Sequence, residues 1–107
     1  MPRSASPGEA GTGGPMLFHV RMTVSLPDDL HYVTRAELLT EEERYSRQLQ
    51  EDGTWLHLWR VVGHYANIGI FDVESAEALH DILWNHPLFS FLTLDITPLA
   101  AHPSRVV

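Results

Sequence analysis

Apolar and polar residues alternate from Met16 to Val24, and this period of two predicts a β-strand with one buried face. Pro27 ends the pattern. A helix is predicted next, from about Asp29 to Asp52, with Asp28 or Asp29 as its N-cap and Gly53 as its C-terminal stop. The first half of the chain therefore contributes one strand and one long helix.

The second half begins with two β-rich runs, Trp55 to Val62 and His64 to Val73, which meet at Gly63. Two such runs around a glycine predict a tight antiparallel hairpin. Ser75 can cap a second helix that reaches about His86, and alternation from Leu92 to Thr97 predicts a last strand. This half therefore contributes a hairpin, a helix and a strand.

The order of these elements is βαββαβ, the ferredoxin-like α+β arrangement, in which both helices cover one face of a four-stranded antiparallel sheet. The opposite face is predicted to pack against another subunit, because its strands are apolar and include Trp55 and Trp59. The tail from Leu99 to Val107 has no pattern of its own and is predicted to reach across a neighbour. A homo-oligomer is therefore expected.

The composition predicts one folded domain at residues 16–107, the size of a single domain. Residues 1–15 are rich in Gly, Pro, Ser and Ala, which cannot bury enough apolar surface to offset the entropy lost on ordering. We interpret them as a disordered leader, as an expression remnant, or as residues upstream of a start at Met16.

The charge and residue content exclude several classes of function. A formal net charge of -7 argues against a nucleic-acid binder, which needs a clustered basic surface, although one or two local arginines can still bind a small anion. The absence of cysteine excludes disulfides, thiolate metal sites and a cysteine nucleophile. No apolar run approaches the roughly 18 residues of a membrane helix, and the N-terminus lacks the apolar core of a signal peptide. No membrane partner is expected, and the cytoplasm is the default location.

Motifs for metal or nucleotide chemistry are missing from the sequence. The 7 histidines show no tight ligand spacing such as HExxH, so no metal site is predicted. The chain also has no glycine-rich phosphate loop and no GxSxG elbow. Nucleotide use and serine hydrolysis therefore have no support.

Glu42 is the candidate for proton transfer. On the predicted helix, spacings of four, three and four place Leu38, Glu42, Tyr45 and Leu49 on one stripe. Glu42 therefore faces the apolar side, where burial disfavours a charged carboxylate and suits a group that exchanges protons near neutral pH. Glu43 lies off the stripe. The alternative is that Glu42 lies at the edge of the stripe and reaches solvent or pairs with an arginine.

The predicted hairpin carries a polar residue on each face. Strand periodicity places His57 between Trp55 and Trp59 on one face, and Arg60 beside Leu58 on the other. A histidine between two tryptophans is more often structural than catalytic, and both interpretations stay open.

Arg60 and Asn67 are the more informative hairpin residues. A guanidinium partly buried among Leu and Val requires an anion, which can be Glu42, Asp95 or a ligand carboxylate. Asn67 interrupts a run of β-forming residues. It either binds loop backbone or donates to a carbonyl or enolate oxygen.

Six blocks of sequence follow one another from the first predicted strand to the tail. They are MLFHVRMTV at 16–24, GTWLHLWR at 53–60, GHYAN at 63–67, FDV at 71–73, PLF at 87–89 and HPS at 102–104. Together they strongly resemble the muconolactone δ-isomerase family, over nearly all of residues 16–104. Several blocks in the correct order are far more specific than one motif.

The resemblance implies a cofactor-free isomerisation of muconolactone to 3-oxoadipate enol-lactone, in the catechol branch of the β-ketoadipate pathway of aromatic degradation. The implied chemistry is a 1,3 proton shift. A base removes the ring proton next to the lactone oxygen, the dienolate is stabilised, and the proton returns to the carbon beside the carbonyl. Members of this family form ring-like homo-oligomers, so the resemblance implies a decamer built from dimers, with pockets at subunit contacts.

The resemblance also assigns roles to residues. Glu42 corresponds to the family's helical glutamate and would shuttle the proton, with His57 as the second catalytic candidate. Arg60, or Arg21 instead, would hold the carboxymethyl carboxylate of the substrate. The other substrate-binding candidates are His19, Tyr65 and Asn67.

The sequence departs from the family around this glutamate. The usual Lys-x-x-Glu-Lys pattern is replaced by Leu39-Thr-Glu-Glu-Glu43. If a lysine there stabilises the dienolate, this chain must do so otherwise or prefer another substrate. The alternatives are a chloromuconolactone dehalogenase or methylmuconolactone isomerase on the same scaffold, and a non-catalytic dimeric α+β module that binds a small ligand.

Overall fold

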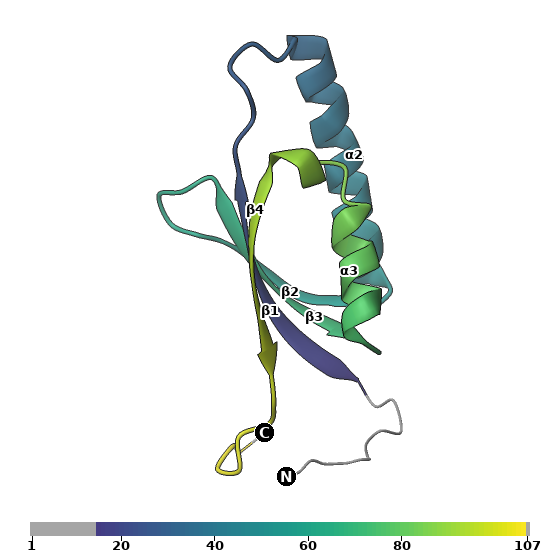
Figure 1. Ribbon diagram of the computed structural model, residues 1–107, viewed down its shortest axis with the longest axis vertical. Coiled ribbons are helices and arrows are strands. Elements are labelled where there is room, and N and C mark those ends of the chain that lie inside the picture. The colour runs from purple at the N-terminus through teal and green to yellow at the C-terminus, as the bar shows by residue number, and fades with distance from the viewer. Residues whose placement is uncertain (1–14, 107) are drawn as a thin grey trace.

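Four strands form a single antiparallel sheet in the order β2-β3-β1-β4, and both helices cover one face of it (Figure 1). The computed structural model describes residues 15–106. The elements in chain order are β1 (Met16–Val24), α2 (Tyr32–Glu51), β2 (Trp55–Arg60), β3 (Ala66–Val73), α3 (Ala76–Trp84), the 3-10 helix η2 (Phe89–Phe91) and β4 (Leu92–Leu99). The predicted ferredoxin-like fold is confirmed. The predicted leader lies outside the described residues, apart from Pro15.

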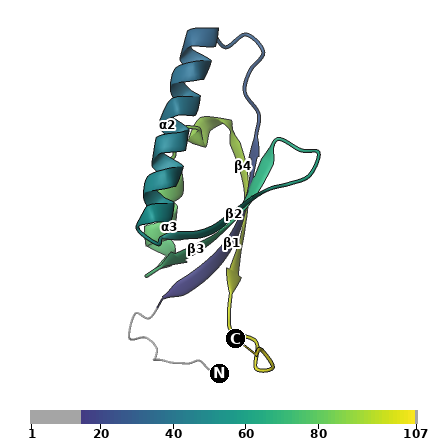
Figure 2. The ribbon, with the colours of Figure 1, turned by 180° about the vertical axis from the view of Figure 1, so that it is seen from behind.

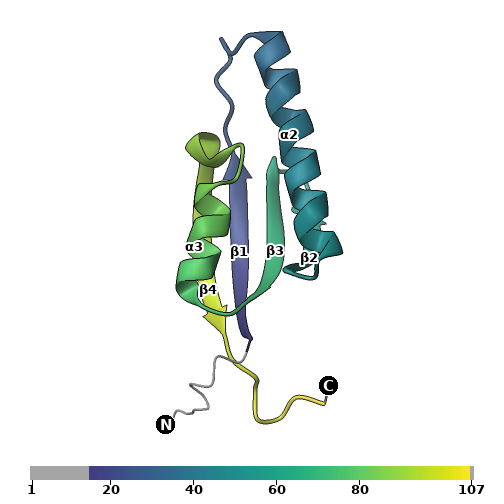
Figure 3. The ribbon, with the colours of Figure 1, turned by 90° about the vertical axis from the view of Figure 1, so that its right-hand side faces the viewer.

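The hydrophobic core fills the space between the sheet and the helices. β1 contributes alternate side chains, which are buried from Phe18 to Val24, and the predicted stripe of α2 faces inward beside them. α3 contributes Leu79 and Leu83, and Figure 3 shows α3 over the β4 side of the sheet and α2 over the β3 side. The alternation read in the sequence therefore marks the buried face of β1 correctly.

Trp55 is the largest fully buried side chain and stacks on Phe71, with ring centroids 4.6 Å apart. Its indole also lies directly against Gly69, where a Cβ atom would overlap it. This close approach explains a glycine in the middle of a strand.

A β-bulge at Leu56 overturns the predicted faces of the hairpin. Trp55 pairs with Phe71 and His57 pairs with the adjacent Ile70, so Leu56 is an extra residue without a partner on β3. Trp55 therefore points into the core, whereas His57 points to the opposite face. The prediction that Trp55 and His57 share a face is wrong, because simple alternation does not continue through a bulge.

The long helix begins later than predicted. α2 starts at Tyr32, and its N-cap is His31, whose Nδ1 accepts a hydrogen bond from the backbone N–H of Val33 at 3.2 Å. Asp28 and Asp29 instead occupy a turn closed by the hydrogen bond from Leu30 N to the Pro27 carbonyl. The end of the helix agrees with the prediction, since Gly53 follows it with a φ of 84°.

Other boundaries also differ from the prediction. The connection of the hairpin spans residues 61–65 rather than a tight turn, although Gly63 has the φ of 80° that favours glycine there. Figure 2 shows this connection bending away from the helices. α3 ends at Trp84, before His86, and β4 continues to Leu99 through Pro98, which an edge strand tolerates.

The face of the sheet opposite the helices has no covering element within residues 15–106 (Figures 1 and 2). We call it the open face, and its residues follow from the strand registers. They are Leu17, His19, Arg21, Thr23, His57, Trp59, Ile68, Ile70, Asp72, Thr93, Asp95, Thr97 and Leu99. Trp59 is 55% exposed on this face. Among the described residues, no helix is both long and apolar enough to cross a membrane.

Candidate active site

A pocket of about 140 Å³ brings α2, the hairpin and the loop after α3 together on the helical side of the sheet. Its lining residues are Met22, Val24, Leu39, Glu42, Arg60, Tyr65, Asn67, His86, Leu88 and Leu92. Four of the residues predicted from the sequence therefore meet here: Glu42, Arg60, Tyr65 and Asn67. The apolar wall and the few convergent polar groups are typical of a small-molecule site.

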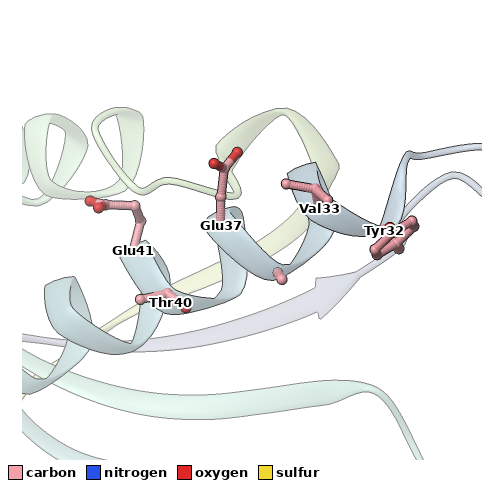
Figure 4. Close-up of a pocket in the computed structure, with 6 residues that line it drawn as sticks. Tyr32, Val33, Glu37, Thr40 and Glu41 are labelled. Atoms are coloured by element: carbon pink, nitrogen blue, oxygen red, sulfur yellow. The ribbon is translucent and has the colours of Figure 1, made fainter.

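A larger hollow of about 510 Å³ lies along the N-terminal half of α2 (Figure 4). Its walls come from a single helix, from Tyr32 to Glu41, and the carboxylates of Glu37 and Glu41 project outward from it. Within residues 15–106, no group from another element lines this surface. The smaller, more enclosed pocket around Glu42 is therefore the better candidate for chemistry.

Glu42 is held inside the pocket by groups from two elements. Its side chain is 26% exposed. The hydroxyl of Ser46, one turn along α2, donates a hydrogen bond to Oε2 at 2.5 Å, and Ser46 itself is buried. The Nε2 atom of His86 lies 4.0 Å from the same oxygen. Glu42 thus faces inward, as its position on the helical stripe predicts.

The neighbouring carboxylates of α2 behave differently. Glu41 and Glu43 are exposed and form ion pairs with Arg44 and Arg47 on the outer surface. Within residues 15–106, no arginine forms an ion pair with Glu42. Among the described residues, the alternative in which Glu42 pairs with an arginine is therefore not observed.

His86 is the residue of this pocket that the sequence analysis missed. It is buried, and its Nδ1 accepts a hydrogen bond from the backbone N–H of Leu88 at 3.0 Å. Burial lowers the pKa of His86, while the charge of Glu42 acts in the opposite direction. The sequence shows only that His86 is a polar residue between the second predicted helix and the Pro87 block. Nothing in the sequence indicates that His86 lies near Glu42.

Tyr45 packs against His86 from α2. Its ring packs edge-on against the imidazole, with centroids 5.7 Å apart, and its hydroxyl donates to the Ile82 carbonyl at 2.7 Å. Burial raises the pKa of Tyr45. This tyrosine therefore stays neutral and ties α2 to α3.

Arg60 and Asn67 form a connected pair across the hairpin. The Nε–H of Arg60 donates to Oδ1 of Asn67 at 3.0 Å, and the guanidinium carbon lies 5.5 Å from the centre of the Tyr65 ring. Because Oδ1 of Asn67 is used as an acceptor, its amide N–H groups remain donors for another partner.

The prediction that Arg60 is partly buried among apolar residues is wrong: Arg60 is exposed, so water can hydrate its guanidinium and burial does not impose an anion on it. No carboxylate of residues 15–106 forms an ion pair with Arg60. Asp95 lies opposite Arg21 on the other face of the sheet, and Glu42 lines the same pocket without an ion pair. Binding of a ligand carboxylate by Arg60 stays a prediction.

Three predicted site residues, His57, His19 and Arg21, lie on the open face and not in this pocket. His57 stacks on Trp59, with ring centroids 5.3 Å apart and planes 14° from parallel. The sheet separates all three from Glu42. In the described part of the chain, no group of three or more His, Asp or Glu side chains is arranged to hold a metal ion.

Comparisons with known proteins identify the family of this chain. The family model described as muconolactone delta-isomerase matches residues 16–105. The chain belongs to the muconolactone delta-isomerase family. The predicted family is thereby confirmed.

Relatives within the family are similar over most of their length. The chain is 53% identical to a muconolactone delta-isomerase of Rhodococcus opacus, over 84% of this chain and 97% of that protein. It is 52% identical to muconolactone delta-isomerase 1 of Acinetobacter lwoffii, over 85% and 95%. A crystal structure of muconolactone isomerase matches with a TM-score of 0.83 and 48% identity, over 86% of this chain and 96% of that one. Fold and sequence therefore point to the same family.

Proposed function

We propose that this protein is a muconolactone delta-isomerase that uses Glu42 to carry out a 1,3 proton shift. The observation that carries the proposal is that Glu42, Arg60 and Asn67 line one pocket, in a chain whose relatives are named for this reaction. The carboxylate supplies a base for the shift, and the amide supplies a donor for the enolate oxygen. The guanidinium, which has no carboxylate partner among the described residues, supplies a group that can bind the substrate carboxylate.

Each group has one task in the proposed reaction. Arg60 binds the carboxymethyl carboxylate of the lactone with its terminal N–H groups, as guanidinium groups commonly bind carboxylates. Glu42 removes the ring proton next to the lactone oxygen, and the electron pair moves into a dienolate. The amide of Asn67 donates to the enolate oxygen. Glu42, now protonated, returns the proton to the carbon beside the carbonyl, so that no atom or electron is gained or lost.

Exchange of solvent deuterium into muconolactone, followed by NMR, tests this proposal. The wild-type protein is expected to incorporate deuterium and form the enol-lactone with no added cofactor. Glu42→Gln is expected to lower turnover by about a hundredfold or more, the usual contribution of a general base. Glu43→Gln is the matched control, because Glu43 is an exposed carboxylate next in the chain. Wild-type exchange rates in Glu42→Gln would remove Glu42 from the mechanism.

Leu39 favours a second candidate within the same chemistry. This residue stands where the family usually has lysine, and it lines the pocket together with Met22 and Leu92. An apolar wall of this kind suits a methyl or chloro substituent on the lactone ring. Product analysis with plain, methylated and chlorinated muconolactones would separate the candidates, and release of chloride would identify dehalogenation.

The proposed enzyme is a homo-oligomer assembled through the open face. Trp59 is 55% exposed there, and Leu17 and Leu99 are 39% and 42% exposed. Exposed apolar side chains on a sheet face that no element of the described chain covers favour a subunit interface there. The resemblance to the family suggests that dimers formed in this way assemble further into a decamer.

A further inference from the structure

The carboxylate of Glu42 is contacted on one oxygen from two sides. Ser46 donates to Oε2 from the next turn of α2, and Nε2 of His86 approaches the same Oε2 to 4.0 Å from the loop after α3. Neither group contacts Oε1. Two elements that are distant in the sequence therefore fix the rotation of this side chain.

The hydrogen bonds of His86 define which ring nitrogen carries the proton. The backbone N–H of Leu88 donates to Nδ1, so Nδ1 presents its lone pair. A neutral imidazole with an unprotonated Nδ1 has its proton on Nε2, the nitrogen that faces Glu42. A second proton on Nδ1 would oppose the Leu88 N–H, and this disfavours the charged ring.

We infer that His86 is a positioning residue, whose neutral imidazole directs its Nε2–H at Oε2 of Glu42 and, with Ser46, leaves Oε1 to exchange the substrate proton. The inference rests on the proposed role of Glu42. At 4.0 Å the contact is longer than a hydrogen bond, so His86 acts as an oriented dipole that favours the charged carboxylate.

The surroundings of the imidazole support this role. Charged or titratable groups face it from two directions, and the other walls are apolar. The charged or titratable groups are Glu42 and Tyr45 from α2 and Arg60 and Tyr65 from the hairpin. The apolar walls include Met22 and Val24 from β1 and Leu92 from β4. Leu39 and the exposed Glu43 supply no positive charge to the pocket. Stabilisation of the Glu42 carboxylate from the helical side therefore falls to His86 and Ser46.

Two substitutions separate this role from a structural one. His86→Asn keeps an oxygen that can accept from the Leu88 N–H but lacks the Nε2 group, whereas His86→Gln can place an amide N–H near the position of Nε2. His86→Asn is expected to lower kcat about threefold to tenfold with little change in KM, because the dipole that favours the charged form of Glu42 is lost. The acid limb of its kcat–pH profile is expected to move to higher pH. His86→Gln is expected to recover part of both effects.

His80→Asn is the control, because His80 is exposed on α3 and lies outside the pocket. It is expected to match the wild-type protein in kcat and pH profile. A folded His86→Asn protein with wild-type kcat and an unmoved acid limb would overturn the inference, even if Glu42→Gln is inactive.

An NMR titration of the His86 ring gives a readout that does not depend on turnover. In the wild-type protein the ring is expected to show the Nε2–H tautomer, and its titration is expected to move to lower pH in Glu42→Gln, because the favourable charge is lost. An identical titration in both proteins, or the Nδ1–H tautomer, would overturn the inference. If the titration of His86 depends on Glu42 but the wild-type protein exchanges no deuterium into muconolactone, the proposed function is refuted instead.

Discussion

The two faces of the sheet use similar residues for different purposes. On the helical side, Arg60 lines a pocket with Glu42, and on the open side Arg21 lies opposite Asp95. β1 serves both faces, since Met22 lines the pocket and its neighbour Arg21 points the other way. The comparison shows that residue type alone does not identify a site residue, because the face decides which groups surround it.

The largest effect is expected on the open face. Trp59→Glu places a charge in the proposed subunit interface, where loss of a central aromatic residue commonly costs about 2 kcal/mol or more. We expect the oligomer to dissociate at micromolar concentration, as measured by size-exclusion chromatography with light scattering. Trp84→Glu is the control, because Trp84 is an exposed tryptophan on the helical side. If Trp84→Glu dissociates the oligomer and Trp59→Glu does not, the interface lies on the helical side and the proposed open-face interface is refuted.

The next effect compares the two arginines. Arg60→Ala removes hydrogen bonds to a charged ligand, worth about 1.5–3 kcal/mol, and is expected to raise KM about tenfold to a hundredfold. Arg21→Ala is expected to leave KM nearly unchanged in a protein that still assembles. Steady-state kinetics with muconolactone measure both. A rise in KM for Arg21→Ala instead would move carboxylate binding to the open face.

The smallest effect concerns stability in acid. Burial lowers the pKa of His86 in the folded chain, so the unfolded chain binds more protons as the pH falls below the ordinary histidine value of 6.5. The contribution of His86 to the free energy of unfolding is therefore expected to be fully present above pH 6.5 and to be lost as the pH falls below that value. Urea denaturation at pH 7.5 and 5.5 should show a smaller loss in His86→Asn than in the wild-type protein. The His80→Asn protein should lose as much stability between pH 7.5 and 5.5 as the wild-type protein. An equal loss in the wild-type, His86→Asn and His80→Asn proteins would assign the pH dependence to titratable groups other than His86.

Much of the fold follows from local patterns in the sequence. The alternation of β1, the stripe of α2 that carries Glu42, and the Ser75 cap of α3, which accepts from the Ala78 N–H at 3.0 Å, each depend on residues close together in the chain. Such local features predict the elements and their buried sides without knowledge of the tertiary structure.

The features that sequence analysis missed depend on long-range geometry. The bulge at Leu56 is visible only once β2 is aligned with β3, and it moves His57 to the face opposite Trp55. His86 reaches Glu42 only because the loop after α3 lies against α2 in the folded chain. The start of α2 was missed because aspartate is a favoured N-cap residue and histidine is not. The turn after Pro27 takes up both aspartates, and the cap falls to His31.

The three tryptophans give the protein a set of optical probes for separate events. Trp55 is 2% exposed in the core, whereas Trp59 and Trp84 are 55% and 60% exposed on opposite sides of the sheet. In a variant that keeps only Trp55, the emission should lie to the blue in the native chain and shift to the red on denaturation. In a variant that keeps only Trp59, the emission should move to the blue when subunits associate. Folding and assembly can therefore be followed by fluorescence in separate samples of one small enzyme.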